Sequence, residues 1–160
     1  MNAITIRRFT AEDRDWLVTQ HRDLYARDEG FDESFGVLVG QIIDEFLAEH
    51  DPTREAGWIA QRGEDRLGSI FCVSLDGSRA KLRLFLLTPA ARGQGLGRRM
   101  LETSMGFARD RGYRSMHLWT HESHRAAGAL YARNGWTMTD SRPVVSFGTD
   151  NVEQTWEILL

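Results

Sequence analysis

The spacing of apolar and polar residues predicts a strand followed by two helices at the start of the chain. Apolar and polar residues alternate over Ala3–Phe9, which is the period of a half-buried strand. Thr10 and Asp13 have the spacing of a helix start, and apolar residues then recur at helical intervals until Gly30. A second helix is predicted over about Asp32–His50, because its apolar residues share one face.

After His50, the spacing of apolar residues changes from the helical period to the alternation typical of strands. Three strands separated by Gly- and Asp-containing turns are predicted: Gly57–Arg62, Leu67–Leu75 and Arg79–Thr88. The elements expected after them are a helix Gly95–Arg111, a strand Ser115–Thr120, a helix Ser123–Asn134 and two closing strands, Trp136–Phe147 and Glu153–Leu160. The residues Leu84–Leu87 are all apolar, as expected of a central strand covered on both faces. This order implies a mixed sheet with helices on its faces.

Length and composition narrow the class of protein. A chain of 160 residues with 41% apolar residues fits one domain, residues 1–160, that can bury a core. The apolar runs are too short to cross a bilayer, so no membrane association is expected, and the first residues do not resemble a secretory signal. The single cysteine, Cys72, suits a reducing compartment. We therefore expect one soluble, cytoplasmic domain.

The charges are divided unevenly along the chain. Residues 1–65 carry 15 acidic and 7 basic residues, whereas residues 66–160 carry 8 acidic and 13 basic residues. A net charge of −3 without a basic cluster argues against a nucleic-acid partner. The imbalance predicts one side that attracts cations and one that attracts anions, unless the charges only form solvated faces.

A glycine-rich loop follows the third of the middle strands. Its sequence is Arg92-Gly93-Gln94-Gly95-Leu96-Gly97-Arg98, and a helix is predicted to begin within it. Glycines let successive backbone N–H groups point into one concavity, and the helix N-terminus and the arginines add positive charge. This combination predicts a pyrophosphate cradle. Two known nucleotide-binding motifs do not match this loop. A P-loop would require Lys-Ser/Thr directly after Gly97, and a dinucleotide-binding fingerprint would require glycine at position 98.

A second motif lies on the next predicted helix. From Ala126 the chain reads Ala-Ala-Gly-Ala-Leu-Tyr-Ala-Arg-Asn-Gly-Trp, which places Tyr131 on a helix that ends at Gly135. The two motifs in this order resemble the GCN5-related N-acetyltransferase (GNAT) superfamily, most specifically over about residues 79–136. Three further segments are similar to the acetyltransferase half of bacterial MarR–GNAT fusion proteins: Gly57-Trp58-Ile59-Ala60, His117-Leu118-Trp119-Thr120 and Gln154-Thr155-Trp156-Glu157.

The resemblance implies an α/β fold with a central, mostly antiparallel sheet, two splayed parallel strands and about four helices on its faces. It also implies an N-acetyltransferase that moves the acetyl group of acetyl-CoA to a primary amine of a small molecule or peptide, without a metal. The alternative of a different class is a non-catalytic acyl-CoA sensor that regulates a partner. Many members of the superfamily dimerise, so a homodimer through the exposed edge of the last strand is a further expectation.

The resemblance also assigns candidate residues. Those expected to bind acetyl-CoA are Phe85, Leu86, Leu87, Arg92, Gly93, Gln94, Gly95, Leu96, Gly97, Arg98 and His124. Leu87, or its neighbour at a bulge, would donate its N–H to the thioester oxygen. Tyr131 would protonate the departing thiolate, although on spacing alone it would be read as a core tyrosine. His124 stands where the superfamily often has an asparagine that contacts CoA, and the imidazole can donate one hydrogen bond in its place.

The acceptor side is less defined. Tyr25, Phe31 and Glu33 lie near the connection between the first two helices, where such proteins usually build their acceptor site. The central strand offers Lys81 and Arg83 but no acid, so the base that deprotonates the amine stays open among Glu33, His21, His117 and a water chain. The acidic balance of residues 1–65 predicts an acceptor that is positively charged before it reacts. The segment His121-Glu122-Ser123-His124 does not have the spacing of a zinc site.

Overall fold

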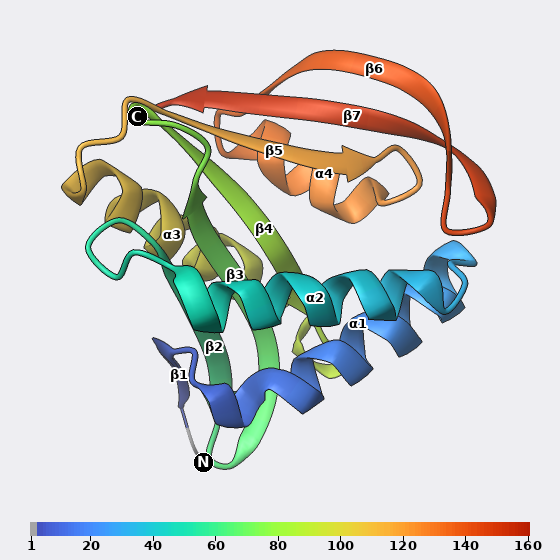
Figure 1. Ribbon diagram of the computed structural model, residues 1–160, viewed down its shortest axis with the longest axis horizontal. Helices are drawn as coiled ribbons and strands as arrows, with labels where there is room; N and C mark the ends of the chain where they lie inside the picture. The colour runs from blue at the N-terminus through green and yellow to red at the C-terminus, as the bar shows by residue number, and fades with distance from the viewer. Residues whose placement is uncertain (1–2) are drawn as a thin grey trace.

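The protein folds into a seven-stranded sheet with helices on both faces (Figure 1). Its structure, a computed structural model, describes residues 3–160. The strands are β1 (Ile4–Arg8), β2 (Ala56–Arg62), β3 (Asp65–Ser74), β4 (Arg79–Leu87), β5 (Ser115–His121), β6 (Thr137–Ser146) and β7 (Thr149–Leu159). The helices are α1 (Arg14–Glu29), α2 (Ser34–Glu49), α3 (Leu96–Asp110) and α4 (Arg125–Arg133), with short 3-10 turns at Ala11–Asp13 and Pro89–Ala91. The predicted α/β class is confirmed.

The strand order is β1-β2-β3-β4-β5-β7-β6, and the pairs are antiparallel except for β4 with β5. The parallel pair is joined only where Arg79–Lys81 face Ser115–His117. Beyond this point β4 and β5 separate, which confirms the expected splay. The last strand, β7, lies between β5 and β6 and has no free edge, so the expectation of a dimer through that edge is wrong. A homodimer through another surface stays a prediction.

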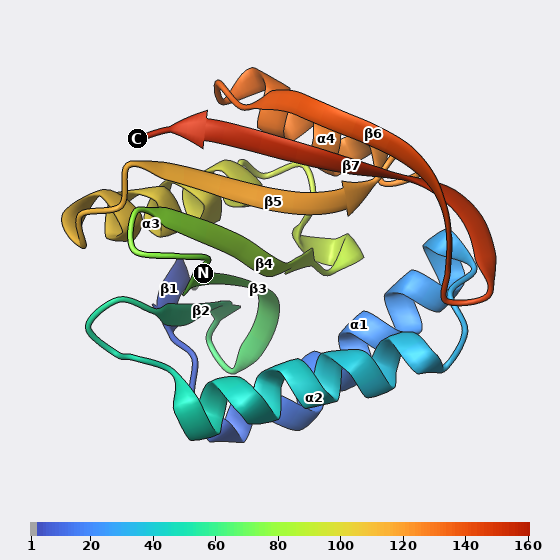
Figure 2. The ribbon, with the colours of Figure 1, turned by 45° about the horizontal axis from the view of Figure 1, so that its top comes forward.

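Two hydrophobic layers hold the helices on opposite faces of the sheet. Figure 2 shows α1 and α2 together below the sheet, with α3 and α4 on its other side. The larger core packs Met100 and Leu101 of α3 and Tyr131 of α4 against β2–β5. The smaller core packs α1 and α2 against Phe71 and Leu84 of the middle strands. Since α1 and α2 pack on one face and α3 and α4 on the other, both faces of the sheet are covered by helices.

A bulge in β4 differs from the expected strand. The register between β3 and β4 shifts between Ser69 and Phe71, and Leu84 has a φ of +52°, in the left-handed region. Phe85 and Leu87 stay partly exposed, since β4 lacks a paired neighbour on the β5 side beyond its first residues. The predicted central strand is confirmed, since Phe85 and Leu87 pack against one core and Leu84 against the other, but its cover is incomplete on the side of Phe85 and Leu87.

The final hairpin is longer and tighter than predicted. Strand β7 begins at Thr149 rather than Glu153, because Phe147 and Gly148 form a two-residue turn. Both have positive φ, +52° and +76°, which is the turn geometry that matches the twist of antiparallel strands. The polar residues after Gly148 resemble a loop in sequence but are held in the ladder with β6.

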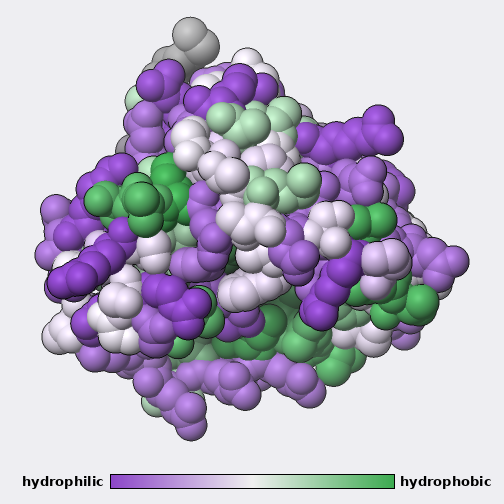
Figure 3. Space-filling model, turned by 90° about the horizontal axis from the view of Figure 1, so that it is seen from above, coloured by the Kyte–Doolittle hydropathy of each residue, from purple (hydrophilic) through white to green (hydrophobic). Residues whose placement is uncertain are grey.

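The surface above β6 and β7 is mixed in character. Figure 3 shows hydrophilic side chains over much of this face, with hydrophobic side chains gathered in a few patches. Strand β6 forms this edge of the sheet and is exposed over most of its length, and it contains Pro143. A proline lacks the N–H that a further strand would need at that position. No helix within residues 3–160 has the length and hydropathy needed to cross a membrane.

Candidate active site

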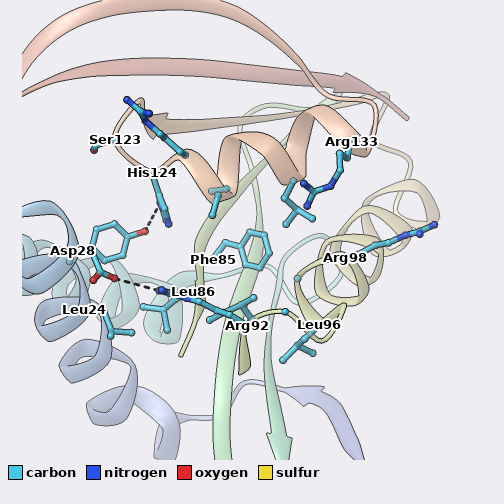
Figure 4. A pocket seen from close by; sticks show the side chains of 18 of the residues that line it. Leu24, Asp28, Phe85, Leu86, Arg92, Leu96, Arg98, Ser123, His124 and Arg133 are labelled. Carbon is cyan, nitrogen blue, oxygen red and sulfur yellow. Dashed lines mark hydrogen bonds and ion pairs between the residues drawn. The ribbon is translucent and has the colours of Figure 1, made fainter. Parts of the chain in front are cut away.

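A cavity of about 850 Å³ lies where β4 and β5 separate (Figure 4). It is enclosed by β4, the loop before α3, one face of α4 and the C-terminal end of α1. Its volume is within the range of ligand sites. Its lining residues are Leu24, Tyr25, Asp28, Glu29, Phe85, Leu86, Leu87, Arg92, Gly93, Gly95, Leu96, Gly97, Arg98, Ser123, His124, Arg125, Ala126, Ala127, Leu130, Arg133 and Asn134.

The loop before α3 carries a run of free backbone donors. Within residues 3–160, the N–H groups of residues 93–98 have no acceptor, and the first helical bond runs from the Arg99 N–H to the Gly95 carbonyl. Gly93 and Gly95 have φ values of +75° and +74°, so glycine is required to turn these groups the same way. Together with the helix dipole, six such donors fit an anion such as a diphosphate.

Positive side chains surround this end of the cavity. Arg92, Arg98, Arg125 and Arg133 all line it, against Asp28 and the neighbouring Glu29. An Arg92 nitrogen lies 3.5 Å from an Asp28 oxygen, as Figure 4 shows, and Arg98 pairs with Glu102 at 2.9 Å. Both pairs are solvent-exposed and therefore weak, so the arginines can turn toward a phosphate.

Gly97 permits three elements to meet beside the cradle. A Cβ at this position would lie 3.2 Å from Cδ2 of Leu130 and 3.4 Å from Cδ1 of Leu87. These contacts are tighter than ordinary packing, so a larger residue would push α3 away from α4 and β4. The glycine therefore keeps the donor loop close to the open edge of β4.

The backbone of β4 offers a donor to the gap between the splayed strands. The Thr88 N–H donates to the Leu67 carbonyl of β3 at 2.9 Å. Because N–H groups alternate in direction along a strand, the Leu87 N–H points away from β3, toward the gap. The N–H of Phe85 shares this direction, so either group can reach a carbonyl oxygen held there.

Tyr131 lies beside the cavity rather than on its surface. Its side chain is 4% exposed and packs against three aromatic rings, with centroid distances of 6.4 Å to Phe85, 5.7 Å to Trp136 and 6.0 Å to Trp156. Its hydroxyl has no hydrogen-bond partner in residues 3–160. Burial raises the pKa of Tyr131, so the phenol keeps its proton at neutral pH and can act only as a donor.

Tyr25 and His124 meet on the wall opposite the cradle. The Tyr25 hydroxyl lies 3.4 Å from Nδ1 of His124, as the dashed line in Figure 4 marks. Burial raises the pKa of Tyr25 and lowers the pKa of His124, so both are neutral near pH 7. This pair can pass a proton, with the phenol donating and the imidazole accepting.

The other residues predicted for the acceptor site are not on the cavity wall. Phe31 is buried in an aromatic cluster with Phe35 and Phe147, which joins the connection before α2 to the tip of the last hairpin. Glu33 precedes α2 and is exposed. Helix α1 ends at Glu29 with Gly30 as its cap, as predicted, and α2 begins at Ser34.

The three side chains considered as the base lie away from the cavity. His21 is fully buried on α1, where Nδ1 lies 2.9 Å from the Leu17 carbonyl oxygen, and burial lowers its pKa to about 4. His117 is paired with Glu157 at 2.6 Å on the other face of the sheet. Glu33 is the third, at the start of α2, and none of these groups lines the cavity.

Gln94 is the remaining predicted residue that does not line the cavity. Its side chain donates to the Ala90 carbonyl and accepts from Arg62, both at 2.9 Å, and thereby fixes the loop. The lining residues that the sequence did not predict are Leu24, Asp28 and Glu29 of α1, Ser123 and Arg125, and those on one face of α4 and at its C-cap, namely Ala126, Ala127, Leu130, Arg133 and Asn134. The i, i+4 and i+7 spacing of the α4 residues was a usable signal once the helix was assigned. Residues 3–160 contain no cluster of His, Cys, Asp or Glu suited to a metal ion.

Known proteins share both the sequence motifs and the fold. Residues 11–136 match the model of the acetyltransferase (GNAT) family. N-acetyltransferase 8F1 of Rattus norvegicus is 30% identical over 95 residues, which cover 56% of this chain and 43% of that protein. N-acetyltransferase 8B of the same organism is 32% identical over 87 residues, covering 51% and 39%. The chain therefore spans less than half the length of these curated relatives.

Solved structures resemble the whole chain. The yncA protein of Salmonella typhimurium, solved with its cofactor acetyl-CoA, has a TM-score of 0.81 at 20% identity, covering 99% of this chain and 95% of that one. A ribosomal-protein-alanine N-acetyltransferase from Brucella melitensis has a TM-score of 0.80 at 18% identity, covering 98% and 99%. At these identities the likeness concerns the fold.

Proposed function

The chain belongs to the acetyltransferase (GNAT) family, and from this premise we propose that it transfers the acetyl group of acetyl-CoA to a primary amine by direct attack. One observation carries the proposal: the run of free N–H groups at residues 93–98 opens into a cavity that follows the unpaired edge of β4. A diphosphate at the donor run would leave the pantetheine arm along that edge, where it can pair as an added strand does. The thioester would then lie in the gap between β4 and β5.

The proposed reaction forms a C–N bond and breaks a C–S bond. The neutral amine attacks the thioester carbonyl, and the N–H of Leu87 or Phe85 stabilises the oxyanion, a contribution of about 3 kcal/mol in comparable sites. Tyr131 then gives its hydroxyl proton to the departing thiolate and regains a proton from the attacking nitrogen, which becomes the neutral amide. The ammonium proton of the acceptor leaves to water or to His124, whose lowered pKa keeps the imidazole ready to accept it.

The acceptor in this proposal is an amine of a small molecule or peptide, and no metal takes part. We also place the protein in the cytoplasm. Its one cysteine, Cys72, is a buried free thiol, as suits a reducing compartment. The position of Tyr25 on the cavity wall supports its assignment beside the acceptor.

A regulatory acyl-CoA sensor is the second candidate. It is favoured by the position of Tyr131, which lies behind the lining of the cavity instead of on it. The resemblance to MarR–GNAT fusion proteins that three tryptophan-containing segments predict would fit the same role, because those proteins join an acetyltransferase to a regulator; the comparisons with known proteins match the acetyltransferase family alone. A sensor would bind acetyl-CoA and release no product.

A thiol-release assay over a panel of amines separates the two functions. An acetyltransferase liberates free CoA only when a suitable amine is present, in proportion to the amine consumed. A sensor shows an acetyl-CoA-dependent rise in melting temperature without amine-dependent thiol release. Absence of both effects would reject both functions.

A further inference from the structure

The packed core on the α1/α2 side of the sheet ends at β4. It includes Ile59 of β2, Phe71 of β3 and Leu84 of β4, and within residues 3–160 it has no member from β5, β6 or β7. Figure 1 shows α2 crossing β3 and β4, while β5 and β7 lie to one side of it. Trp119 of β5 is 41% exposed on this side. The α1/α2 core therefore leaves Trp119 of β5 uncovered, beside a hollow beneath α2 that Arg83 borders, and we call these two features together the groove.

Two cations from β4 form the floor of this groove. Lys81 is in register with His117 of β5, and Arg83 is in register with Phe71 of β3, so both side chains are on the α2 side. Both are half-buried. Nζ of Lys81 lies 4.7 Å from the ring centroid of Trp119. Arg83 borders a hollow of about 210 Å³ beneath α2, which Glu45, Glu49 and Glu55 also line.

Neither cation has an anionic partner. Within residues 3–160, Lys81 and Arg83 make no hydrogen bond and no ion pair shorter than 4 Å, whereas His117 on the same face pairs with Glu157 at 2.6 Å. Burial lowers the pKa of Lys81, and the charge of Arg83 lowers it further. Half-buried charges without partners are costly, so a bound anion would relieve this cost.

Within the described part of the chain, the acidic residues nearest to Arg83 do not form ion pairs with the two cations. Burial lowers the pKa of Arg83, and the charges of Glu45 and Glu55 only partly oppose this effect. The carboxylate of Glu55 already accepts the N–H groups of Asp51 and Ser74, each at 2.9 Å. The acidic excess of residues 1–65 is partly taken up elsewhere, since Asp15, Asp23, Asp28 and Asp44 all lie in exposed pairs with arginines of α1.

We propose that Lys81 and Arg83 bind an acidic group of the acceptor, which is a small amine that also carries a carboxylate or phosphonate, as an amino acid does. This inference rests on the proposed function, because it takes the amine to react at the β4 splay. Arg83 directly precedes the bulge, and Phe85 follows two residues later, about 7 Å along the strand. One small molecule can therefore place its amine at the thioester and its anion on the two cations. The exposed ring of Trp119 offers an apolar wall for the rest of the molecule.

Matched acceptors and matched variants test the assignment. Each set contains an amino acid, its carboxamide and the corresponding amine without the acidic group, with an aminophosphonate as a second anion. The variants are Lys81→Met and Arg83→Met, which keep an apolar stem. The control is Arg79→Met, which removes a cation from the same face of β4 that is already paired with Asp76 at 2.6 Å. Acetyl-CoA binding, followed by melting temperature, should be the same in all four proteins.

We expect the wild-type protein to prefer the acid to its carboxamide. Each groove variant should lower kcat/KM for the acid by about 10- to 100-fold, the usual range for a lost charge-assisted bond, and leave the carboxamide within about twofold. The control should stay within about twofold for both. Equal use of acid and carboxamide by the wild-type protein, or an equal loss for both in Arg83→Met, would overturn the inference.

A binding measurement keeps this test independent of turnover. Calorimetry can measure the N-acetylated amino acid and its amide on the wild-type protein and on Arg83→Met. If no amine is acetylated, the proposed function fails, but selective binding of the N-acetylated acid that is lost in Arg83→Met still supports the anion site. Absence of that binding, or its persistence in Arg83→Met, overturns the anion site whatever the activity.

Discussion

The two sides of the strand β4 offer different chemistry to a ligand. On the α3/α4 side, the donors are backbone N–H groups of residues 93–98, fixed by a helix start and by two glycines with positive φ. On the α1/α2 side, the charges are the side chains of Lys81 and Arg83, placed by strand alternation. Backbone donors tolerate many side chains, whereas the groove depends on two. The difference teaches that cofactor binding and acceptor choice can be altered separately in this protein.

The largest effect is expected from a substitution of Tyr131. Tyr131→Phe removes the proposed proton donor and keeps the ring, so acetyl-CoA should still bind while turnover falls by about 10²- to 10⁴-fold. Steady-state rates at saturating substrates measure this. Tyr113→Phe is the matched control, because the Tyr113 hydroxyl donates to the Arg54 carbonyl at 2.9 Å, away from the cavity. An unchanged rate in Tyr131→Phe would assign the donor role elsewhere, with Tyr25 the next residue to test.

Low pH should lower the free energy of unfolding through His21, which lies in the layer formed by α1 and α2. Burial lowers the pKa of His21 to about 4, so the folded protein resists a proton that the unfolded chain takes up below its ordinary pKa of about 6.5. The contribution is complete above about pH 6.5 and is lost as the pH falls toward 4, which amounts to about 3 kcal/mol of unfolding free energy. Denaturant titrations across this range should show a shallower loss in His21→Leu. Parallel curves for the two proteins would contradict the burial of this imidazole.

A substitution at Gly95 should disrupt the backbone donors of residues 93–98 and leave Lys81 and Arg83 in the groove unchanged. Gly95 has a φ of +74°, which a β-branched residue rarely adopts, so Gly95→Val should turn the N–H groups away from their common point. We expect acetyl-CoA affinity to fall by about 10- to 100-fold, the equivalent of one or two lost charge-assisted bonds. Gly106→Val is the control, because a Cβ there meets nothing within 4 Å. Binding of an N-acetylated amino acid should be unchanged in both variants, and unchanged acetyl-CoA affinity in Gly95→Val would exclude the cradle.

Salt should produce the smallest effect, and mainly on the cofactor side. The arginines that line the cradle are solvent-exposed, so their attraction for phosphates is screened at high ionic strength. Acetyl-CoA affinity should fall by at most about fivefold between low and high salt, because exposed ion pairs contribute little. A much steeper dependence would mean that side-chain charges, and not the backbone donors, hold the diphosphate.

The difference between the two sides of β4 also explains which of the two sites the sequence predicts. The cradle is local: Gly93, Gly95 and the helix start are neighbours in the chain, so the sequence predicts them together. The groove is not local, because Lys81 meets Trp119 only through the register of β4 with β5. In the sequence, Lys81 and Arg83 stand out only as bases on a strand without an acid.

Other departures have the same origin in long-range pairing. The bulge at Leu84 arises from the register with β3, and the burial of His21 depends on packing against α2, including Phe35. The position of β7 between β5 and β6 follows from a tight turn at Phe147 that hydropathy does not reveal. Local periodicity predicts which segments are helices and strands, but not which strand becomes an edge.

The most direct measurement follows the acetyl group itself. The protein is incubated with acetyl-CoA labelled in its acetyl group and with a free amino acid, and the amino acid is analysed by mass spectrometry. We expect the label on the amino nitrogen together with an equal amount of free CoA thiol. A protein that binds acetyl-CoA while every amine in the panel stays unlabelled would contradict acetyl transfer as its function.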